Sequence, residues 1–239
     1  MTKKVINQKG KLDEIFINSI ENKYNFNNKP INRLNLLGDN KDENSGDKIK
    51  LLDELKKKIN SIEDCNLKNN SKNLVMGNGN INSPIMIVGE APGIEEDKSA
   101  IVFQGEMGDL LDKMLIAIDI ERKNIYCTYA VNFRPPEDRK PSSQEIKKYS
   151  NFLKEHISII NPRIIVLMGS SAMEAITGIN GKISSERGKW KEIIIKNITY
   201  PVMISFNPSY LIRFPENKKF SWNDLKKIRQ KIKDLNLEI

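Results

Sequence analysis

The sequence predicts an α/β protein, a three-layer sandwich with a central, mostly parallel four-stranded sheet covered by helices on both faces. Helical patterns alternate with four short apolar runs, which is typical of this class. The runs are apolar almost throughout, as in parallel strands that are buried on both faces. Each run leads into a polar loop or a loop marked by Gly or Pro, over residues 84–93, 124–136, 162–171 and 200–209.

Four segments between and after these runs carry helical signals. The 3.6-residue period is clear in residues 108–118. Residues 142–160 open with serines that favour a helix N-cap, and residues 170–178 end at a glycine. The last helix is expected over 221–235, because Ser221 is followed three residues later by an acidic residue, as in a capping box.

The N-terminal part has a different composition. Residues 11–22 have apolar side chains at helical spacing, and Asn22–Lys48 is rich in Asn, Asp, Lys and Gly. From Ile49 onwards, apolar residues again fall on one helical face. We therefore expect an N-terminal helix plus a flexible polar linker over 1–48, and a folded domain over 49–239.

The composition restricts the possible partners and cofactors. The 239 residues include 39 Lys and Arg against 31 Asp and Glu, for a formal net charge of +8. Such a charge attracts polyanions such as nucleic acid, although many basic proteins bind none. The two cysteines, Cys65 and Cys127, form no disulfide or zinc pattern. No stretch reaches the roughly 18 apolar residues of a membrane span. We therefore expect a cytoplasmic protein without a metal site, and a monomer is the default expectation.

The loops after the apolar runs should face one crevice, because ligands of such sheets bind beyond the carboxyl ends of the strands. Glu90 directly follows the first run, and Phe103 precedes a helix that starts at a glycine. Each has a plain alternative, a solvated turn carboxylate or a core aromatic. The run ending at Phe206 leads into Asn207, and the segment after it is apolar and then basic. This turn could therefore reverse the chain or contact a substrate.

Six motifs in order make the chain resemble the uracil-DNA glycosylase superfamily, most closely its type 4 branch, which is also described as phage DNA polymerase-related. They cover most of the chain from about Ile62 to Leu235. The motifs are GEAPG with ED shortly after (89–97), Phe103 with GDLLD (108–112), RPPEDRKP (134–141), LMGSSAMEAITG (167–178), RGKW (187–190) and NPSYLIR (207–213).

The resemblance implies a DNA repair enzyme that flips uracil out of DNA and hydrolyses its bond to the sugar. It assigns the uracil pocket to Gly89, Glu90, Ala91 and Phe103, which stacks on the base. Two positions depart from the family pattern. Asn207 stands where a His normally donates to the uracil carbonyl oxygen, and Tyr129 stands where an Asn normally pairs with the uracil edge.

These departures leave two functions open. The first is a glycosylase for uracil or a related damaged base, slow or altered because Tyr129 and Asn207 replace the usual Asn and His, with Glu90 and Asn207 as the catalytic residues. Its alternative is a catalytically retired protein that binds DNA or a base on the same fold. A nucleotide-binding protein is set aside, because no GxGxxG or GxxxxGK[ST] sequence follows a strand.

The family resemblance also bears on a cofactor. Type 4 enzymes usually hold a [4Fe–4S] cluster on four cysteines, and the corresponding positions here are Ile62, Cys65, Phe133 and Tyr149. One thiolate cannot hold such a cluster. We therefore expect no cluster and apolar packing in its place.

Contacts with single- or double-stranded DNA are expected from two groups of residues. Apolar residues after Asn207 would enter the space left by the flipped base, and basic residues would bind phosphates. The candidate residues are Arg134, Arg139, Arg187, Lys189, Ser209, Tyr210, Leu211, Ile212 and Arg213.

Overall fold

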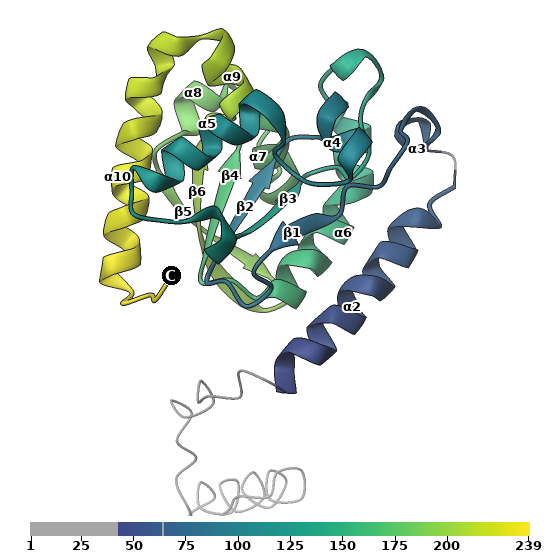
Figure 1. Ribbon diagram of the computed structural model, residues 1–239, viewed down its shortest axis with the longest axis horizontal. Coiled ribbons are helices and arrows are strands. Elements are labelled where there is room, and N and C mark those ends of the chain that lie inside the picture. The colour runs from purple at the N-terminus through teal and green to yellow at the C-terminus, as the bar shows by residue number, and fades with distance from the viewer. Residues whose placement is uncertain (1–42, 64) are drawn as a thin grey trace, which may run out of the picture. The chain divides into compact units, whose positions relative to one another are not determined.

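A computed structural model describes residues 43–63 and 65–239, and its centre is a six-stranded sheet (Figure 1). The strands lie in the order β1-β3-β2-β4-β6-β5. Their bounds are β1 Gly77–Gly79, β2 Ile85–Gly89, β3 Tyr126–Tyr129, β4 Ile164–Met168, β5 Trp190–Ile195 and β6 Ile198–Ser205.

The predicted α/β class is confirmed, with one correction to the sheet. The four predicted strands are β2, β3, β4 and β6, and they are parallel to one another. The sheet has two further strands, because β1 and β5 pair antiparallel at its edges. The sequence Gly-Asn-Gly of β1 gives no apolar strand signal, and most residues of β5 are not fully buried, so neither edge has the pattern of the central strands.

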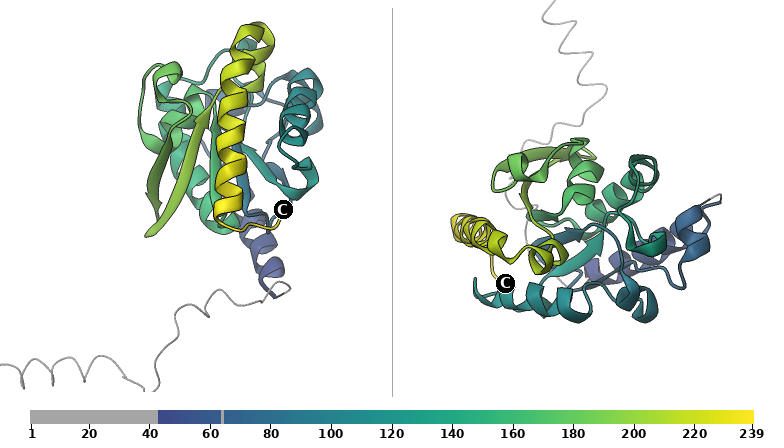
Figure 2. Two further views of the ribbon diagram at one scale, coloured as in Figure 1. Left: turned by 90° about the vertical axis from the view of Figure 1, so that its left-hand side faces the viewer. Right: turned by 90° about the horizontal axis from the view of Figure 1, so that it is seen from above.

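Helices cover both faces of the sheet (Figure 2). In β4, Ile164, Val166 and Met168 belong to the core beneath α5, α9 and α10, while Ile165 and Leu167 belong to the core beneath α6 and α7. The helices are α2 Glu43–Asn60, α3 Asn66–Asn70, α4 Ile94–Ser99, α5 Gly105–Ile116, α6 Ser143–Ile160, α7 Ser170–Thr177, α8 Ile183–Glu186, α9 Pro208–Arg213 and α10 Lys218–Asp234, with single turns η2 Arg122–Asn124, η3 Pro136–Asp138 and η4 Pro215–Asn217.

The start of the first described helix differs from the expectation. Helix α2 begins at Glu43, so residues 43–48, which the composition assigned to a polar linker, are helical. The apolar face begins only after them, which is why the sequence pattern placed the helix later. The helix expected over 11–22 lies outside the described residues. Among the residues that the structure describes, no helix is long and apolar enough to cross a membrane.

Local signals explain where the helices nearest the site begin. Ser142 caps α6 by accepting a hydrogen bond from the Glu145 N–H, and the Glu145 carboxylate accepts one from the Ser142 N–H at 2.7 Å. Asn207 caps α9 in the same way, followed by Pro208 at the first helical position. The predicted capping residues of α6 therefore do fix its start, whereas α10 starts three residues before Ser221.

The one histidine of the chain is a core residue. His156 lies on α6, and its Nε2 is 2.9 Å from the Tyr126 hydroxyl. Burial lowers the pKa of His156 from its ordinary 6.5 to about 3, because the imidazolium would lose its hydration. The imidazole is therefore neutral in the folded protein at neutral pH.

This burial predicts a loss of stability in mild acid. The unfolded chain binds a proton at His156 between about pH 6.5 and pH 3 and the folded chain does not, so stability falls as the pH falls through this window. We expect urea denaturation to show a free energy of unfolding about 2 kcal/mol lower at pH 5 than at pH 7 from this group. The difference should shrink by that amount in His156→Gln. An unchanged pH dependence in the variant would contradict this account.

Candidate active site

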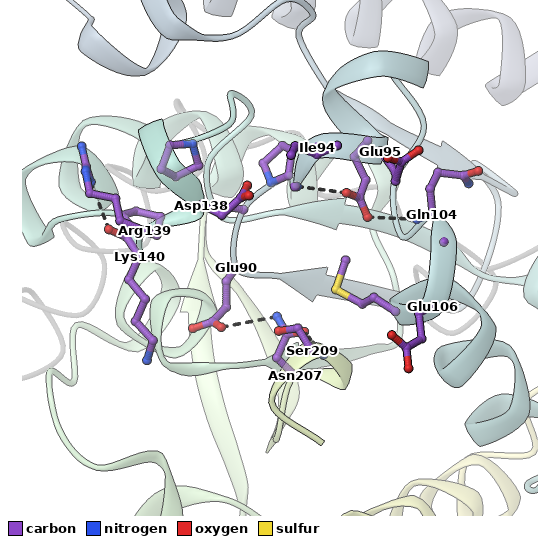
Figure 3. A pocket seen from close by; sticks show the side chains of 18 of the residues that line it. Glu90, Ile94, Glu95, Gln104, Glu106, Asp138, Arg139, Lys140, Asn207 and Ser209 are labelled. Carbon is purple, nitrogen blue, oxygen red and sulfur yellow. Dashed lines mark hydrogen bonds between the residues drawn. The ribbon is translucent and has the colours of Figure 1, made fainter. Parts of the chain in front are cut away.

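The carboxyl ends of β2 and β6 meet at a cavity of about 520 Å³ (Figure 3). Glu90 follows β2 and Asn207 follows β6, and both line this cavity. The lining is completed by residues in or next to α4, η3, α5 and α9, including Ala91, Glu96, Gln104, Arg139, Lys140, Ser209 and Arg213. The cavity thus lies beyond the carboxyl ends of the parallel strands, where ligands of such sheets bind.

The Glu90 carboxylate is held by the start of α7. Its Oε1 accepts hydrogen bonds from the Ser170 hydroxyl at 3.1 Å, the Ser171 N–H at 3.1 Å and the Ser171 hydroxyl at 3.3 Å. The partial positive charge of a helix N-terminus favours a carboxylate there. The absence of a side chain at Gly169 makes space for the Glu90 side chain, since a Cβ at position 169 would overlap Glu90 Cγ and Cδ. The φ of +107° at Gly169 also favours glycine. The carboxylate is therefore fixed in one orientation.

Asn207 is oriented by its capping role. Its Oδ1 accepts hydrogen bonds from the Ser209 N–H at 3.1 Å and the Ser209 hydroxyl at 3.2 Å. The amide nitrogen must then point the other way, where it donates to Glu90 Oε2 at 3.4 Å and to the Met168 carbonyl oxygen at 3.5 Å. Figure 3 shows Glu90 and Asn207 facing each other. The turn after β6 thus reverses the chain and also places an amide that lines the cavity and donates to Glu90.

Tyr129 covers the ring of Phe103. The two ring centroids are 5.0 Å apart, and the Phe103 N–H donates to the Tyr129 hydroxyl at 2.9 Å. Both rings close over Gly89, where a Cβ would lie 2.6 Å from a Tyr129 ring carbon. Phe103 is only 1% exposed and does not line the large cavity. The ring on which a base is expected to stack is therefore buried, with Tyr129 packed against it and the Arg122 guanidinium 5.5 Å from its centroid.

Glu96 is a site residue to which the sequence reading assigned no role. Its carboxylate accepts hydrogen bonds from the Tyr129 hydroxyl at 3.2 Å, the Gln104 N–H at 2.9 Å and the Gly93 N–H at 2.9 Å. The pKa of Tyr129 is raised well above its usual value, mainly by burial and next by the nearby charge of Glu96. The phenol therefore stays protonated and donates to the Glu96 carboxylate. The sequence signal that could have identified Glu96 is its position three residues after Gly93, which is the position of the acid in a capping box at the start of α4.

The predicted phosphate-binding arginines are in different situations. Arg139 and Arg213 line the cavity. Arg139 also makes a bidentate ion pair with Glu145, which lowers the pKa of that carboxyl to about 2. Arg134 is paired with Asp138 at 2.7 Å, and Lys189 is exposed.

Arg187 belongs to the packing of α10 and not to the cavity. Its guanidinium makes a bidentate ion pair with the fully buried Asp224, which also accepts from the Ser205 hydroxyl at 2.8 Å. Lys140, which was not predicted, is the cation nearest to Glu90 in the hydrogen-bond network. Its ammonium group donates to the Ser170 hydroxyl at 3.0 Å.

The expected apolar wedge is only partly accessible. Leu211 is buried in the core beside α5, while Tyr210 and Ile212 are half-buried. Tyr210 lies between the rings of Phe206 and Phe214, with both centroids 4.9 Å away. Leu211 therefore anchors α9 to the domain.

The four positions that correspond to cluster ligands lie together but do not fit an iron–sulfur cluster. Ile62, Cys65, Phe133 and Tyr149 belong to one apolar group between α2 and α6. The Cys65 sulfur is 3.1 Å from the Tyr149 hydroxyl, and the Phe133 and Tyr149 rings meet edge to face. One thiolate among apolar and aromatic side chains lacks the donor set that a cluster needs. Across residues 43–63 and 65–239, no group of three or more His, Cys, Asp or Glu is arranged to hold a metal ion.

The fold and this site define a class of α/β enzyme whose polar groups stand at the carboxyl edge of a parallel sheet. The chain belongs to the uracil DNA glycosylase superfamily, since the model of that family matches residues 76–229.

Relatives support this assignment. The type-4 uracil-DNA glycosylase of Thermotoga maritima is 33% identical over 77% of this chain and 95% of its own length. The type-4 enzyme of Sulfurisphaera tokodaii is 35% identical over 75% of this chain and 84% of its own length. A DNA polymerase of Bacillus phage SP01 is 29% identical over 62% of this chain, but over only 16% of its own length.

The Tyr129 hydroxyl should contribute to stability. Tyr129→Phe leaves the buried Glu96 carboxylate and the Phe103 N–H each without one partner, so we expect the free energy of unfolding to fall by about 1–3 kcal/mol in urea denaturation. Tyr200→Phe is the matched control, because its hydroxyl has one partner, Asn161, at 3.2 Å. A Tyr129→Phe protein no less stable than the control would show that these hydrogen bonds contribute little.

The packing around Cys65 predicts a protein without a cluster. We expect the purified chain to be colourless. A [4Fe–4S] protein contains about four iron atoms per chain, and we expect far less iron than that here. A type-4 relative expressed and purified in parallel controls for cluster loss during handling. Stoichiometric iron in this chain would overturn the reading of these four positions.

Proposed function

We propose that this chain is a hydrolase that removes uracil, or a related damaged base, from DNA. The observation that carries the proposal is the pair of Glu90 and Asn207 in the cavity, where Asn207 Nδ2 lies 3.4 Å from Glu90 Oε2. The start of α7 fixes the carboxylate, and the start of α9 fixes the amide. Membership in the superfamily supplies the reaction class. DNA is accordingly the proposed partner, and we expect the protein to act as a cytoplasmic monomer.

Each group has a role in the proposed reaction. Water adds its hydroxyl to the sugar carbon, the bond from that carbon to the base nitrogen breaks with its electron pair going to the base, and the base takes up a proton. The Glu90 carboxylate positions the water and stabilises positive charge on the sugar. The Asn207 amide donates to the carbonyl oxygen of the departing base, where negative charge develops.

Cations in the cavity lining support DNA as the substrate. Arg139, Lys140 and Arg213 line the same cavity as Glu90. Their charges suit the phosphates on either side of a flipped nucleotide.

A second candidate, a DNA- or base-binding protein without catalysis, is favoured by Tyr129. Its ring covers Phe103, so a base can stack there only after Tyr129 has moved. That movement would break the hydrogen bonds to Phe103 and Glu96. If the pocket stays closed, the fold would retain its DNA surface and lose base release.

An assay of base release separates the two functions. A labelled oligonucleotide with one uracil is incubated with each protein and treated with alkali to cut abasic sites. We expect slow release by the native chain, and a rate lower by about 10²–10³ in Glu90→Gln and in Asn207→Ala, because each removes a group aimed at developing charge. Tyr129→Asn and Asn207→His should both be faster than the native chain.

Controls and contrary outcomes complete this test. Glu192→Gln changes an exposed carboxylate on the edge strand β5 and should leave the rate unchanged. Native activity equal to that of a type-4 relative would refute the proposed effect of Tyr129 and Asn207. No release by the native chain, with release by the Tyr129→Asn, Asn207→His double variant, would establish the binding protein instead.

A further inference from the structure

The exposed aromatic side chains of this domain are concentrated in one segment. Phe214, Phe220 and Trp222 are 45%, 40% and 43% exposed. Every other Phe, Tyr and Trp among the described residues is buried or half-buried. Three open aromatic rings within a short stretch are unusual for a surface that contacts only water, because such rings are normally covered.

Two of these rings, Phe214 and Phe220, are connected to the candidate active site by ring contacts. Phe214 ends a stack that starts at Phe206, the residue before Asn207, and passes through Tyr210. Phe220 is joined to the same stack by Arg187, whose guanidinium lies 5.5 Å from the Phe206 ring and 5.4 Å from the Phe220 ring. The segment follows α9 and leads into the start of α10 (Figure 1).

Lysines accompany each end of the segment. Lys219 lies 5.1 Å from the Phe220 ring, and Lys226 lies 5.9 Å from the Trp222 ring. Lys218, Lys219 and Lys226 are exposed, and no carboxylate of the described residues pairs with them. The positive charges are therefore free to meet an anionic partner.

A hollow lies beside Trp222. Its volume is about 200 Å³, and its lining is mainly apolar, from α5, α9 and α10. Two lysines, Lys113 and Lys218, also line it. An apolar recess with cations beside it suits a flat base attached to a phosphate backbone.

We propose that Phe214, Phe220 and Trp222, with Lys218, Lys219 and Lys226, form a basic aromatic surface around the start of α10, and that this surface binds single-stranded DNA beyond the active site. Open rings stack on the faces of unpaired bases, and the lysines contact the phosphates. In a duplex those base faces are already covered by their neighbours, so rings at this position would gain nothing from stacking. The inference rests on the proposed function only for the class of partner, DNA.

Binding to a single strand without uracil tests this surface. The probe is a labelled oligonucleotide of about 12 thymidines, within the usual size of such sites. The Trp190→Phe chain leaves Trp222 as the one tryptophan, since the sequence has two. We expect its emission to be quenched on binding. In the otherwise native chain, Phe220→Ala and Trp222→Ala should each weaken binding about tenfold.

The salt dependence tests the lysines. The Lys218→Gln, Lys219→Gln double variant should reduce the slope of log affinity against log salt by about 1.4, since each phosphate contact on a single strand contributes about 0.7. Ile194→Ala and Lys196→Gln are matched controls in the β5–β6 hairpin, where Ile194 is 72% exposed, and both should bind as the native chain does.

Several outcomes would overturn the proposed surface. These are no binding of the probe, binding without quenching of Trp222, an equal loss in the Ile194→Ala control, or a blunt duplex bound as tightly with the same dependence on Phe220 and Trp222. Because the probe has no uracil, the result is independent of base release. Quenched, salt-dependent binding by a chain that releases no uracil would refute the hydrolase and keep the surface.

Discussion

The hydrogen bonds of the Glu90 carboxylate hold the candidate site together. One oxygen is bound by the start of α7 and the other by Asn207, so a single side chain connects the carboxyl ends of β2, β4 and β6. The geometry of the cavity follows from this arrangement, because Asn207 also sets the start of α9 and thereby the direction of the segment beyond it. Weakening this carboxylate network would affect Glu90, Asn207 and the start of α9 together.

A second network, around Glu96, holds Tyr129 against the ring of Phe103. Glu96 binds the hydroxyl of Tyr129 and the backbone beside Phe103, and Tyr129 fills the space over Gly89. An Asn at position 129 is shorter and would uncover the side of the Phe103 ring that Tyr129 contacts, while Arg122 would still lie 5.5 Å from that ring. The two proposed functions therefore differ in whether this buried phenol moves. The cavity near Glu90 exists in both cases.

The sequence was sufficient for the parallel strands and for the location of the site, because both depend on continuous apolar runs and the polar residues directly after them. It was insufficient where the partner of a residue is distant in the chain. Arg187 and Arg213 look alike in sequence, yet only Arg187 meets a buried acid, Asp224. The sequence predicts that Leu211 is part of an apolar wedge, but the structure buries it in the core with residues of α5. The edge strand β1, with no apolar side chain, left no pattern to detect.

Gly169 and Glu90 restrict the order in which this site can change. A side chain at position 169 would occupy the space of the Glu90 carboxylate, so the glycine cannot be replaced while the acid is present. The reverse order has no such obstacle, because a smaller residue at position 90 only empties space. Descent towards a site without its acid would therefore begin at position 90, while the φ of +107° would still disfavour a side chain at position 169. A lineage that still has the glycine can regain the acid by substitution at position 90 alone.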